Sequence, residues 1–222
     1  KYISSFSVPQ EALTRESDAD QPAPSLSEAE KETFRQRKSV FAADYGRGST
    51  TAVWAAGAPR GISNRKPAWE KAAGQGALRL KRNADGIGDT LAYQVKDNLN
   101  ASLGTVEVTV CPVGPTAAKE IIFDATEIVL VAKYPTNPRL RTGMRLILNE
   151  ESRMEWQCLE EGVVVASVTS PPVTLLQETW SRISFSWAGS SVALFLNGKK
   201  VASGEGVALP SGMGKYFFVG SN

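Results

Sequence analysis

Histidine is absent from the sequence of 222 residues. Histidine is the most frequent general base near neutral pH and the commonest zinc ligand, so both uses are closed to this chain. A Ser-His-Asp or Cys-His catalytic arrangement therefore cannot be assembled from its residues alone.

Cysteine is scarce, and its two positions are Cys111 and Cys158. Two cysteines cannot by themselves provide the four ligands of a structural zinc site. Cys158 shares its strand face with Met154 and Trp156, whereas Cys111 has the parity opposite to the apolar face that ends at Val110. This parity favours two free thiols over a disulfide, although a twist at a strand end would still allow a bridge.

Long apolar runs and an excess of one charge are also missing. No apolar segment approaches the roughly 18 residues needed to span a bilayer, so we expect no membrane span. The chain has 25 basic and 23 acidic residues, interleaved, with a net charge of +2. Nucleic-acid binding usually requires a basic stripe, so we expect no nucleic-acid partner.

Residues 1–38 differ in composition from the rest and are predicted to form an N-terminal arm or linker. A Pro-containing stretch precedes a helical pattern over 25–38, with glutamates early and basic residues late, which suits the helix dipole. Two overlapping S-x-x-E pairs fit a capping box: Ser25 with Glu28, and Ser27 with Glu30. Its thin apolar content favours a short surface helix that packs locally over an arm that docks on a neighbour.

From residue 39 onward the pattern changes to short segments of strand character with no helix between them, which favours an antiparallel sandwich. Residues 46–76 are rich in Gly, Ala and Ser and are expected to be loops around one short strand. The expected strands before residue 178 are 40–45, 51–55, 74–80, 90–95, 104–110, 121–124, 128–133, 143–149, 153–160 and 163–169, the last ended by Pro171-Pro172.

The last 45 residues carry the most specific pattern. Ile183, Phe185 and Trp187 alternate with polar residues, which indicates a strand with one buried face. A second alternating segment follows at 191–196, and Asn197-Gly198 supplies the two residues of a tight hairpin turn. One more strand is expected before the chain stops at Asn222.

This W-x-x-I-x-F-x-W run, the hairpin ending in L-N-G-K, and the segments G-Q-G-A-L-R-L and G-T-V-E-V together resemble the concanavalin A-like, LamG-like jelly-roll family. The resemblance covers about residues 39–220 and implies an all-β, antiparallel two-sheet jelly-roll sandwich with a short N-terminal helical arm. In that family another strand normally follows, so residues 39–222 are expected to form a domain without its final strand.

The resemblance also predicts an open sheet edge at Val40–Tyr45. A partner chain, further residues, or the arm folding back could complete such an edge, and we favour the first two. Gly46 stands where the family's first strand often has an acid, which is the second departure from the pattern.

Whether this fold is catalytic here depends on whether the catalytic residues of its related enzymes are present. Related laminarinase-type glycosidases use E-x-D-x-x-E on one strand, and the polysaccharide lyases of the fold use a His and a Tyr. Neither set is present, and the adjacent acids Glu150-Glu151 and Glu160-Glu161 lie at expected turns. We therefore expect no enzyme.

A calcium loop is a weak candidate. Oxygen-bearing side chains surround glycines in the segment 83–89, namely Asn83, Asp85 and Asp89. The segment lacks a distal bidentate Glu, so an ordinary glycine-rich hairpin turn is favoured and no cofactor other than calcium is considered.

Ligand contacts are expected from two further groups. Trp54, Trp69 and Tyr93 could stack on sugar rings, although a core position is favoured for the two tryptophans. A polar face would arise if the outward residues of several strands shared one sheet; solvated Glu–Arg pairs are the simpler interpretation. The candidates on this face are Glu107, Arg145, Glu155, Gln157 and Arg182.

Taken together, we expect a non-catalytic, carbohydrate-binding module of an extracellular or cell-surface protein. The alternative is a structural or assembly subunit that forms a homo- or hetero-oligomer through its open sheet edge. A glycosidase relative is a third, weaker hypothesis. Because one fold hosts many functions, the resemblance predicts the fold, and it does not identify the ligand.

Overall fold

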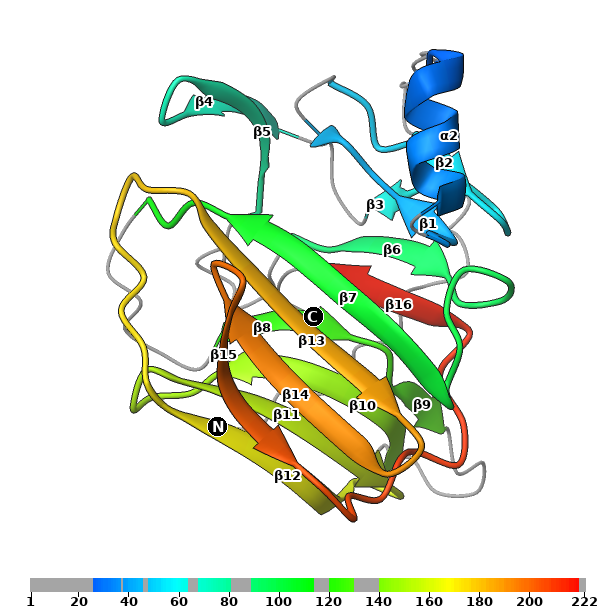
Figure 1. Cartoon of the computed structure of the whole chain (residues 1–222), viewed down its shortest axis with the longest axis vertical. Coiled ribbons are helices and arrows are strands. Elements are labelled where there is room, and N and C mark those ends of the chain that lie inside the picture. Colours follow the sequence, from blue (N-terminus) through cyan, green and yellow to red (C-terminus); the bar gives the residue numbers. More distant parts are fainter. Residues whose placement is uncertain are drawn as a thin grey trace, which may run out of the picture.

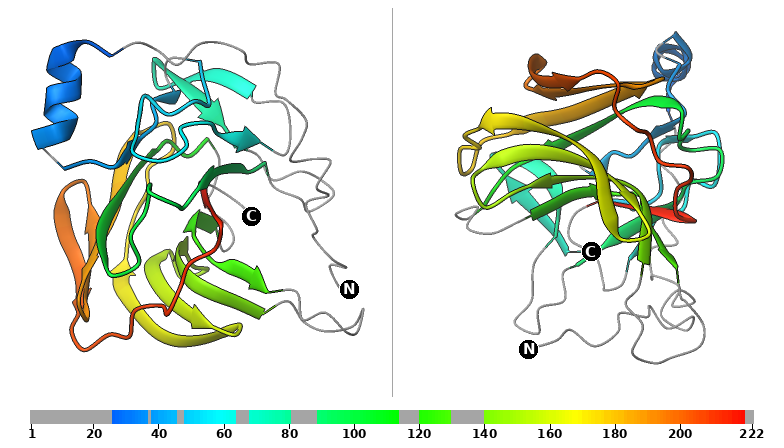
Figure 2. Two further views of the ribbon diagram at one scale, coloured as in Figure 1. Left: turned by 90° about the vertical axis from the view of Figure 1, so that its right-hand side faces the viewer. Right: turned by 90° about the horizontal axis from the view of Figure 1, so that it is seen from below.

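The computed structural model describes residues 26–36, 38–45, 48–63, 68–80, 89–113, 120–129 and 140–219, with the backbone alone for 127–129 and 140. Within these residues the chain is an all-β sandwich whose strand pairs are all antiparallel, with one helix. The predicted fold class is confirmed. Figure 1 shows the two sheets one behind the other, and Figure 2 shows the same layers from the side and from below.

The larger sheet has eight strands in the order β12-β11-β10-β8-β16-β6-β3, and β9 pairs with the beginning of β10. Apolar residues at every second position of β10 and β11 belong to the core, which places one face of these strands inward: Met144, Leu146 and Leu148, and Met154, Trp156 and Cys158. The bounds are β3 Ile62–Ser63, β6 Leu91–Gln94, β8 Glu120–Asp124, β9 Glu127–Val129, β10 Leu140–Leu148, β11 Arg153–Glu160, β12 Val163–Pro172 and β16 Tyr216–Val219.

The smaller sheet has four strands in the order β15-β14-β13-β7. The Asn197-Gly198 turn joins β14 to β15, with φ of 51° and 79° at its two residues, as the sequence predicts. The bounds are β7 Leu103–Val110, β13 Ser181–Ala188, β14 Ser191–Leu196 and β15 Lys199–Gly204.

The core lies between the two sheets and is rich in aromatic rings. Phe123 of the larger sheet packs against Phe185 of the smaller sheet at 5.5 Å between ring centroids, and Phe185 stacks on Trp187 at 5.3 Å. The predicted inward face of β13 is confirmed, because Ile183, Phe185 and Trp187 are all buried. Both cysteines are free thiols, Cys158 buried and Cys111 partly buried, as the parity argument favours.

Helix α2 spans Glu28–Gln36 and begins with the predicted capping box. The backbone N–H of Ser27 donates to Glu30 Oε2 at 2.8 Å, and the N–H of Glu30 donates to Ser27 Oγ at 3.3 Å. The helix buries none of its residues fully, yet the Phe34 ring stacks on Trp54 at 5.7 Å. It therefore packs locally, as predicted, above the sandwich in Figure 1.

Two small strand pairs lie beside the sandwich. β1 (Phe41–Ala42) pairs with β2 (Trp54–Ala55) of the same chain, and the Phe41 ring contacts Tyr93 at 4.6 Å. β4 (Ala68–Ala72) pairs with β5 (Gln75–Arg79) as a hairpin that projects from the top of Figure 1. The prediction of loops around one short strand over 46–76 is wrong at 62–63 and 68–72, which form β3 and β4.

The last described strand lies in the middle of the larger sheet. β16 pairs with β6 on one side and β8 on the other, and Phe217 packs its ring on Tyr93 and Phe123. β12 continues through Pro171 and Pro172 rather than ending before them, and Pro172 pairs with Arg153. Proline is tolerated there because β12 is the outermost strand of its sheet.

Candidate functional site

Polar side chains gather on the face of the larger sheet that points away from the core. Because Met154, Trp156 and Cys158 of β11 are buried in the core, residues 153, 155 and 157 point to the other face. Register brings their neighbours alongside: Arg145 opposite Gln157, and Ile147 opposite Glu155. The sheet therefore aligns three of the predicted ligand residues, which are Arg145, Glu155 and Gln157.

A groove of about 520 Å³ opens on this face. The one apolar residue of its lining, Ile147, is 1% exposed, and Thr169 of β12 forms one wall. The rest of its lining is polar and comes from β10, β11 and the hairpin between them: Asn149, Glu150, Glu151, Arg153, Glu155 and Gln157.

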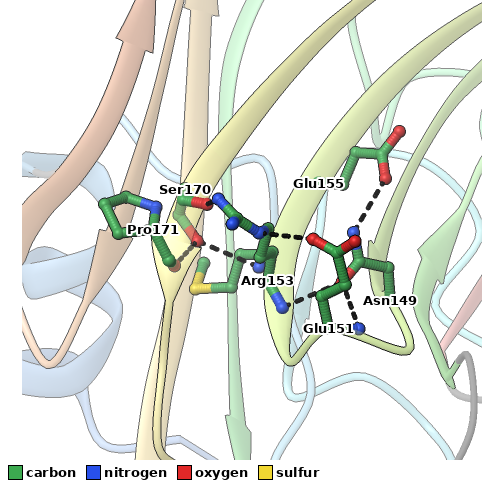
Figure 3. A network of polar contacts seen from close by, with 7 residues as sticks. Asn149, Glu151, Arg153, Glu155, Ser170 and Pro171 are labelled. Atoms are coloured by element: carbon green, nitrogen blue, oxygen red, sulfur yellow. Dashed lines mark hydrogen bonds and ion pairs between the residues drawn. The ribbon is translucent and has the colours of Figure 1, made fainter.

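Asn149 organises the end of the groove, as Figure 3 shows. Its Oδ1 accepts the backbone N–H groups of Glu151 and Arg153, both at 3.0 Å, which closes the hairpin turn. Its Nδ2 donates to Glu155 Oε2 at 3.3 Å, and Arg153 Nε donates to Glu151 Oε2 at 2.8 Å. The wall at this end is thus held by the β10–β11 turn itself.

A chain of hydrogen bonds continues along the face. Gln157 Nε2 donates to Glu155 Oε1, and Arg145 Nε donates to Gln157 Oε1 at 2.7 Å. Each of these planar groups keeps further donor or acceptor positions beyond the bonds named, because a carboxylate accepts about four bonds and a guanidinium donates five. Gln157 is buried and Glu155 partly buried, so their orientations are fixed before any ligand arrives.

Arg145 lies in the interior half of this network. Burial lowers the pKa of its guanidinium, Arg141 lowers it further, and Asp124 and Glu155 oppose that effect. Asp124 is fully buried and accepts from Arg141 Nη1 at 2.9 Å and from Thr126 Oγ1 at 2.6 Å. The carboxylate of Asp124 therefore anchors Arg141 at the end of the row.

Glu107 and Arg182 are separated from this face. They lie on β7 and β13 of the smaller sheet, where both are exposed and form a cross-strand ion pair at 3.6 Å. The condition for one continuous polar face is therefore not met, because the strands concerned belong to two different sheets. Such an exposed pair contributes about 1 kcal/mol or less, which matches the simpler interpretation of a solvated pair.

Trp54 and Tyr93 are structural. Trp54 Nε1 donates to the Ser39 carbonyl at 2.7 Å, and its ring lies under Phe34. Tyr93 is fully buried, and its hydroxyl donates to the Thr50 carbonyl at 2.7 Å, so it cannot contact a surface ligand. The prediction of Tyr93 as a ligand contact is wrong, since the short β6 is a central strand buried on both faces.

Trp69 differs from these two aromatic residues, because 37% of it is exposed, on the projecting β4–β5 hairpin. It lines a hollow of about 250 Å³ away from the groove residues. The favoured core position is thus wrong for Trp69, although it is right for Trp156 and Trp187, which the sequence assigned to the core.

Of the three residues of the predicted calcium loop, the structure describes one, Asp89. Asn83 and Asp85 lie outside the described residues, and Asp89 is partly buried and engaged in an interaction of its own. Within the described ranges, no group of three or more Cys, Asp or Glu side chains could hold a metal ion. Over the same part of the chain, no helix is long and apolar enough to cross a membrane.

Comparison with solved structures finds proteins of similar fold. Domain 4 of AbnA, an extracellular GH43 arabinanase from Geobacillus stearothermophilus, in complex with arabinotriose, is similar to the chain with a TM-score of 0.55 and 14% identity. The likeness covers 82% of this chain and 83% of that one. No protein-family model matches the chain. No curated protein matches it either.

Weaker likenesses extend to other jelly-roll sandwiches. The Bacillus licheniformis β-glucanase has a TM-score of 0.42 at 13% identity, covering 67% of each chain. Domains LG4-5 of the mouse laminin α1 chain have a TM-score of 0.38 at 10% identity, and they cover 58% of this chain and 30% of that one. At these scores the two likenesses add nothing to the fold assignment. The fold is the concanavalin A-like jelly-roll sandwich that the sequence motifs predict.

Sequence reasoning missed the part of the site that the β10–β11 turn provides. Asn149, Glu151 and Arg153 line the groove together with the predicted residues. From the sequence, Asn149 could be recognised only as the residue before a short connection, although an Asn side chain in such a turn often forms a hydrogen bond with the backbone two residues ahead. That signal predicts the turn, and it does not predict that the turn ends a groove.

Proposed function

We propose that the chain is a non-catalytic carbohydrate-binding module whose sugar site is the groove on the outer face of the larger sheet. The observation that carries the proposal is the row of mutually oriented planar polar side chains: Gln157, Glu155 and Asn149 line the groove, and Arg145 adjoins them. Sugars carry several hydroxyl groups, and oriented amide, carboxylate and guanidinium groups can donate to them and accept from them.

The size of the groove supports a short glycan. At about 520 Å³ it lies within the range of roughly 300–1,000 Å³ that is typical of ligand sites. Its acids and bases are mixed, and Glu151 is already paired with Arg153, so the site does not select for a strongly charged ligand. A neutral oligosaccharide is therefore the ligand class that we propose.

Binding without hydrolysis is supported by the way two carboxylates of the groove are engaged. A glycosidase needs one carboxyl group as acid and a second as nucleophile or base, about 5.5 Å or about 6.5–9.5 Å apart. In the groove, Glu155 accepts hydrogen bonds from Asn149 and Gln157, and Glu151 is paired with Arg153 at 2.8 Å, so both serve as acceptors within the protein.

The fold likeness is consistent with this proposal but does not carry it. The arabinotriose belongs to the arabinanase domain, and a shared fold hosts many functions. We propose an extracellular or cell-surface location on the same basis, and a glycan as the principal partner.

A glycan array tests the proposed function directly. The native chain should bind at least one neutral oligosaccharide, and the Gln157→Ala variant should lose that signal while keeping its circular dichroism spectrum. The bound oligosaccharide should stay intact when product formation is followed by mass spectrometry. Binding to no glycan, or release of shorter sugars that stops in Glu155→Gln, would contradict the proposal.

A second candidate function, an assembly subunit, is favoured by one observation on β12. Val163, Val164 and Val165 are 63%, 43% and 48% exposed at the start of this outermost strand, and residues 163–172 include no charge. An uncharged apolar edge is open to pairing with another strand, although a bulge in the β11–β12 ladder weakens the template. Light scattering of the native chain and Val164→Lys tests this function: a dimer that the lysine converts to monomer would support it.

A further inference from the structure

Trp69 is exposed on the β4–β5 hairpin, where most residues are exposed as well. β4 and β5 are joined by Ala73 and Gly74, whose φ values of 43° and 79° form a tight turn. All but one of the residues of β4 are exposed, so a tryptophan at its second position is not required by packing. A large exposed aromatic side chain on a well-formed hairpin needs another explanation.

The hollow beside Trp69 exists because its neighbours are small. Lys71 lies two positions along β4 and therefore on the same side of the hairpin, and its cross-strand partner is Gly76. Gly48 and Ala77 also line the hollow, and a Cβ on Gly48 would meet nothing within 4 Å. Open space thus adjoins the indole ring.

An ion pair links the two strands of the hairpin, and one hydrogen bond ties the hairpin to the rest of the chain. Arg79 Nη1 forms an ion pair with Glu70 Oε1 at 2.8 Å across its open end. Near its turn, the Ala72 carbonyl accepts a hydrogen bond from Trp180 Nε1 at 3.2 Å, which ties the hairpin to the chain just before β13. The aromatic face is therefore presented by a fixed element, which reduces the entropy lost when a ligand binds.

Tyr45 closes the inner side of the hollow. Its hydroxyl donates a hydrogen bond to the Tyr93 hydroxyl at 3.2 Å, and burial raises the pKa of Tyr45 to about 12. The floor is thus continuous with the hydrogen-bonded tyrosine pair of the core, whereas the outer side is open. The hollow combines an aromatic wall, a rigid floor and the Lys71 ammonium group as a donor.

We propose that this hollow binds one pyranose ring of a neutral glycan, as a second sugar-contacting site independent of the groove. The Trp69 ring would lie against the C–H face of the sugar, and Lys71 would donate to a ring hydroxyl. Its volume of about 250 Å³ suits a single ring rather than a chain of sugars. This site does not rest on the groove, because the two sets of lining residues do not overlap.

Tryptophan side-chain NMR tests the site in the full chain. The five indole N–H signals are assigned with single Trp→Phe variants, and the protein is titrated to millimolar concentration with hexasaccharides of β-1,3-glucan, β-1,4-glucan, β-1,4-mannan and β-1,4-xylan. We expect the Trp69 signal to move with at least one of them. Trp69→Ala should weaken that interaction about tenfold, the scale of one aromatic contact with its buried area.

Two matched variants separate the hollow from the hairpin. Gly76→Val adds a side chain on the Trp69 side and should abolish the Trp69 shift, whereas Gln75→Val puts valine in place of a longer side chain on the opposite side and should leave the shift unchanged. The shift should also persist in Gln157→Ala. No movement of Trp69 with any of the four sugars, or equal losses in Gly76→Val and Gln75→Val, would overturn the site while leaving the groove to be judged by its own variants.

Discussion

Tyr93 illustrates how one hydroxyl can serve the core rather than a ligand. It donates to the Thr50 carbonyl and accepts from the Tyr45 hydroxyl inside the protein. Tyr93→Phe leaves the buried Thr50 carbonyl without that donor, so the free energy of unfolding should fall by about 1–3 kcal/mol. Urea unfolding measures this loss, and sugar binding should be unchanged. A variant of native stability that no longer binds sugar would contradict the assignment.

Cys158 provides a second prediction at the residue scale. Burial raises the pKa of its thiol to about 11, and the charge of Glu160 adds to the effect. Iodoacetamide at pH 8 should therefore modify Cys111, which is partly buried, well before Cys158 in the native protein. Peptide mass spectrometry gives the order. Equal labelling of the two thiols under native conditions would show that Cys158 is accessible.

The same thiol makes stability depend on pH. Its folded pKa lies above the ordinary value of 9.0, so its contribution is complete below about pH 9 and is lost as the pH rises through about 11. The difference in unfolding free energy between the native chain and Cys158→Ala should therefore shrink over this interval. A difference that is constant from pH 8 to pH 11, measured by denaturant titration, would contradict the raised pKa.

At the scale of elements, β10 depends on a glycine. Gly143 has φ of +137°, and a Cβ there would lie 2.4 Å from the Ala125 carbonyl oxygen. Gly143→Ala should therefore destabilise the protein by about 3 kcal/mol, because backbone must shift where β10 meets the residues after β8. Gly189→Ala is the control, since its site has φ of +58° and open space, and should cost about 1 kcal/mol. Equal thermal shifts for the two variants would exclude the steric explanation.

Strands that bury one face were predictable, and the exposed ones were not. β11 and β13 alternate apolar and polar residues because their inner faces are in the core. β4 carries no such alternation, since neither of its faces is covered, and its residues therefore read as loop. The capping box of α2 was predictable for a different reason: both of its hydrogen bonds are local.

At the scale of the whole molecule, sequence periodicity predicts which face of a strand a residue occupies. It does not predict the sheet to which that strand belongs. Glu107 and Gln157 both point outward, yet they lie on the smaller and the larger sheet. The insertion of β16 between β6 and β8 is equally non-local, and no short pattern encodes it. Three of the five polar candidates therefore share one face, and this could be known only from the sheet order.

The central claim is that sugar binds the outer face of the larger sheet. Isothermal titration with the oligosaccharide selected on the array should compare Gln157→Ala with Arg182→Ala, its counterpart on the outer face of the smaller sheet. We expect affinity to fall about tenfold or more in Gln157→Ala, which leaves Arg145 and Glu155 without their shared partner, and to stay within about twofold in Arg182→Ala. Loss of binding in Arg182→Ala with native affinity in Gln157→Ala would contradict the account.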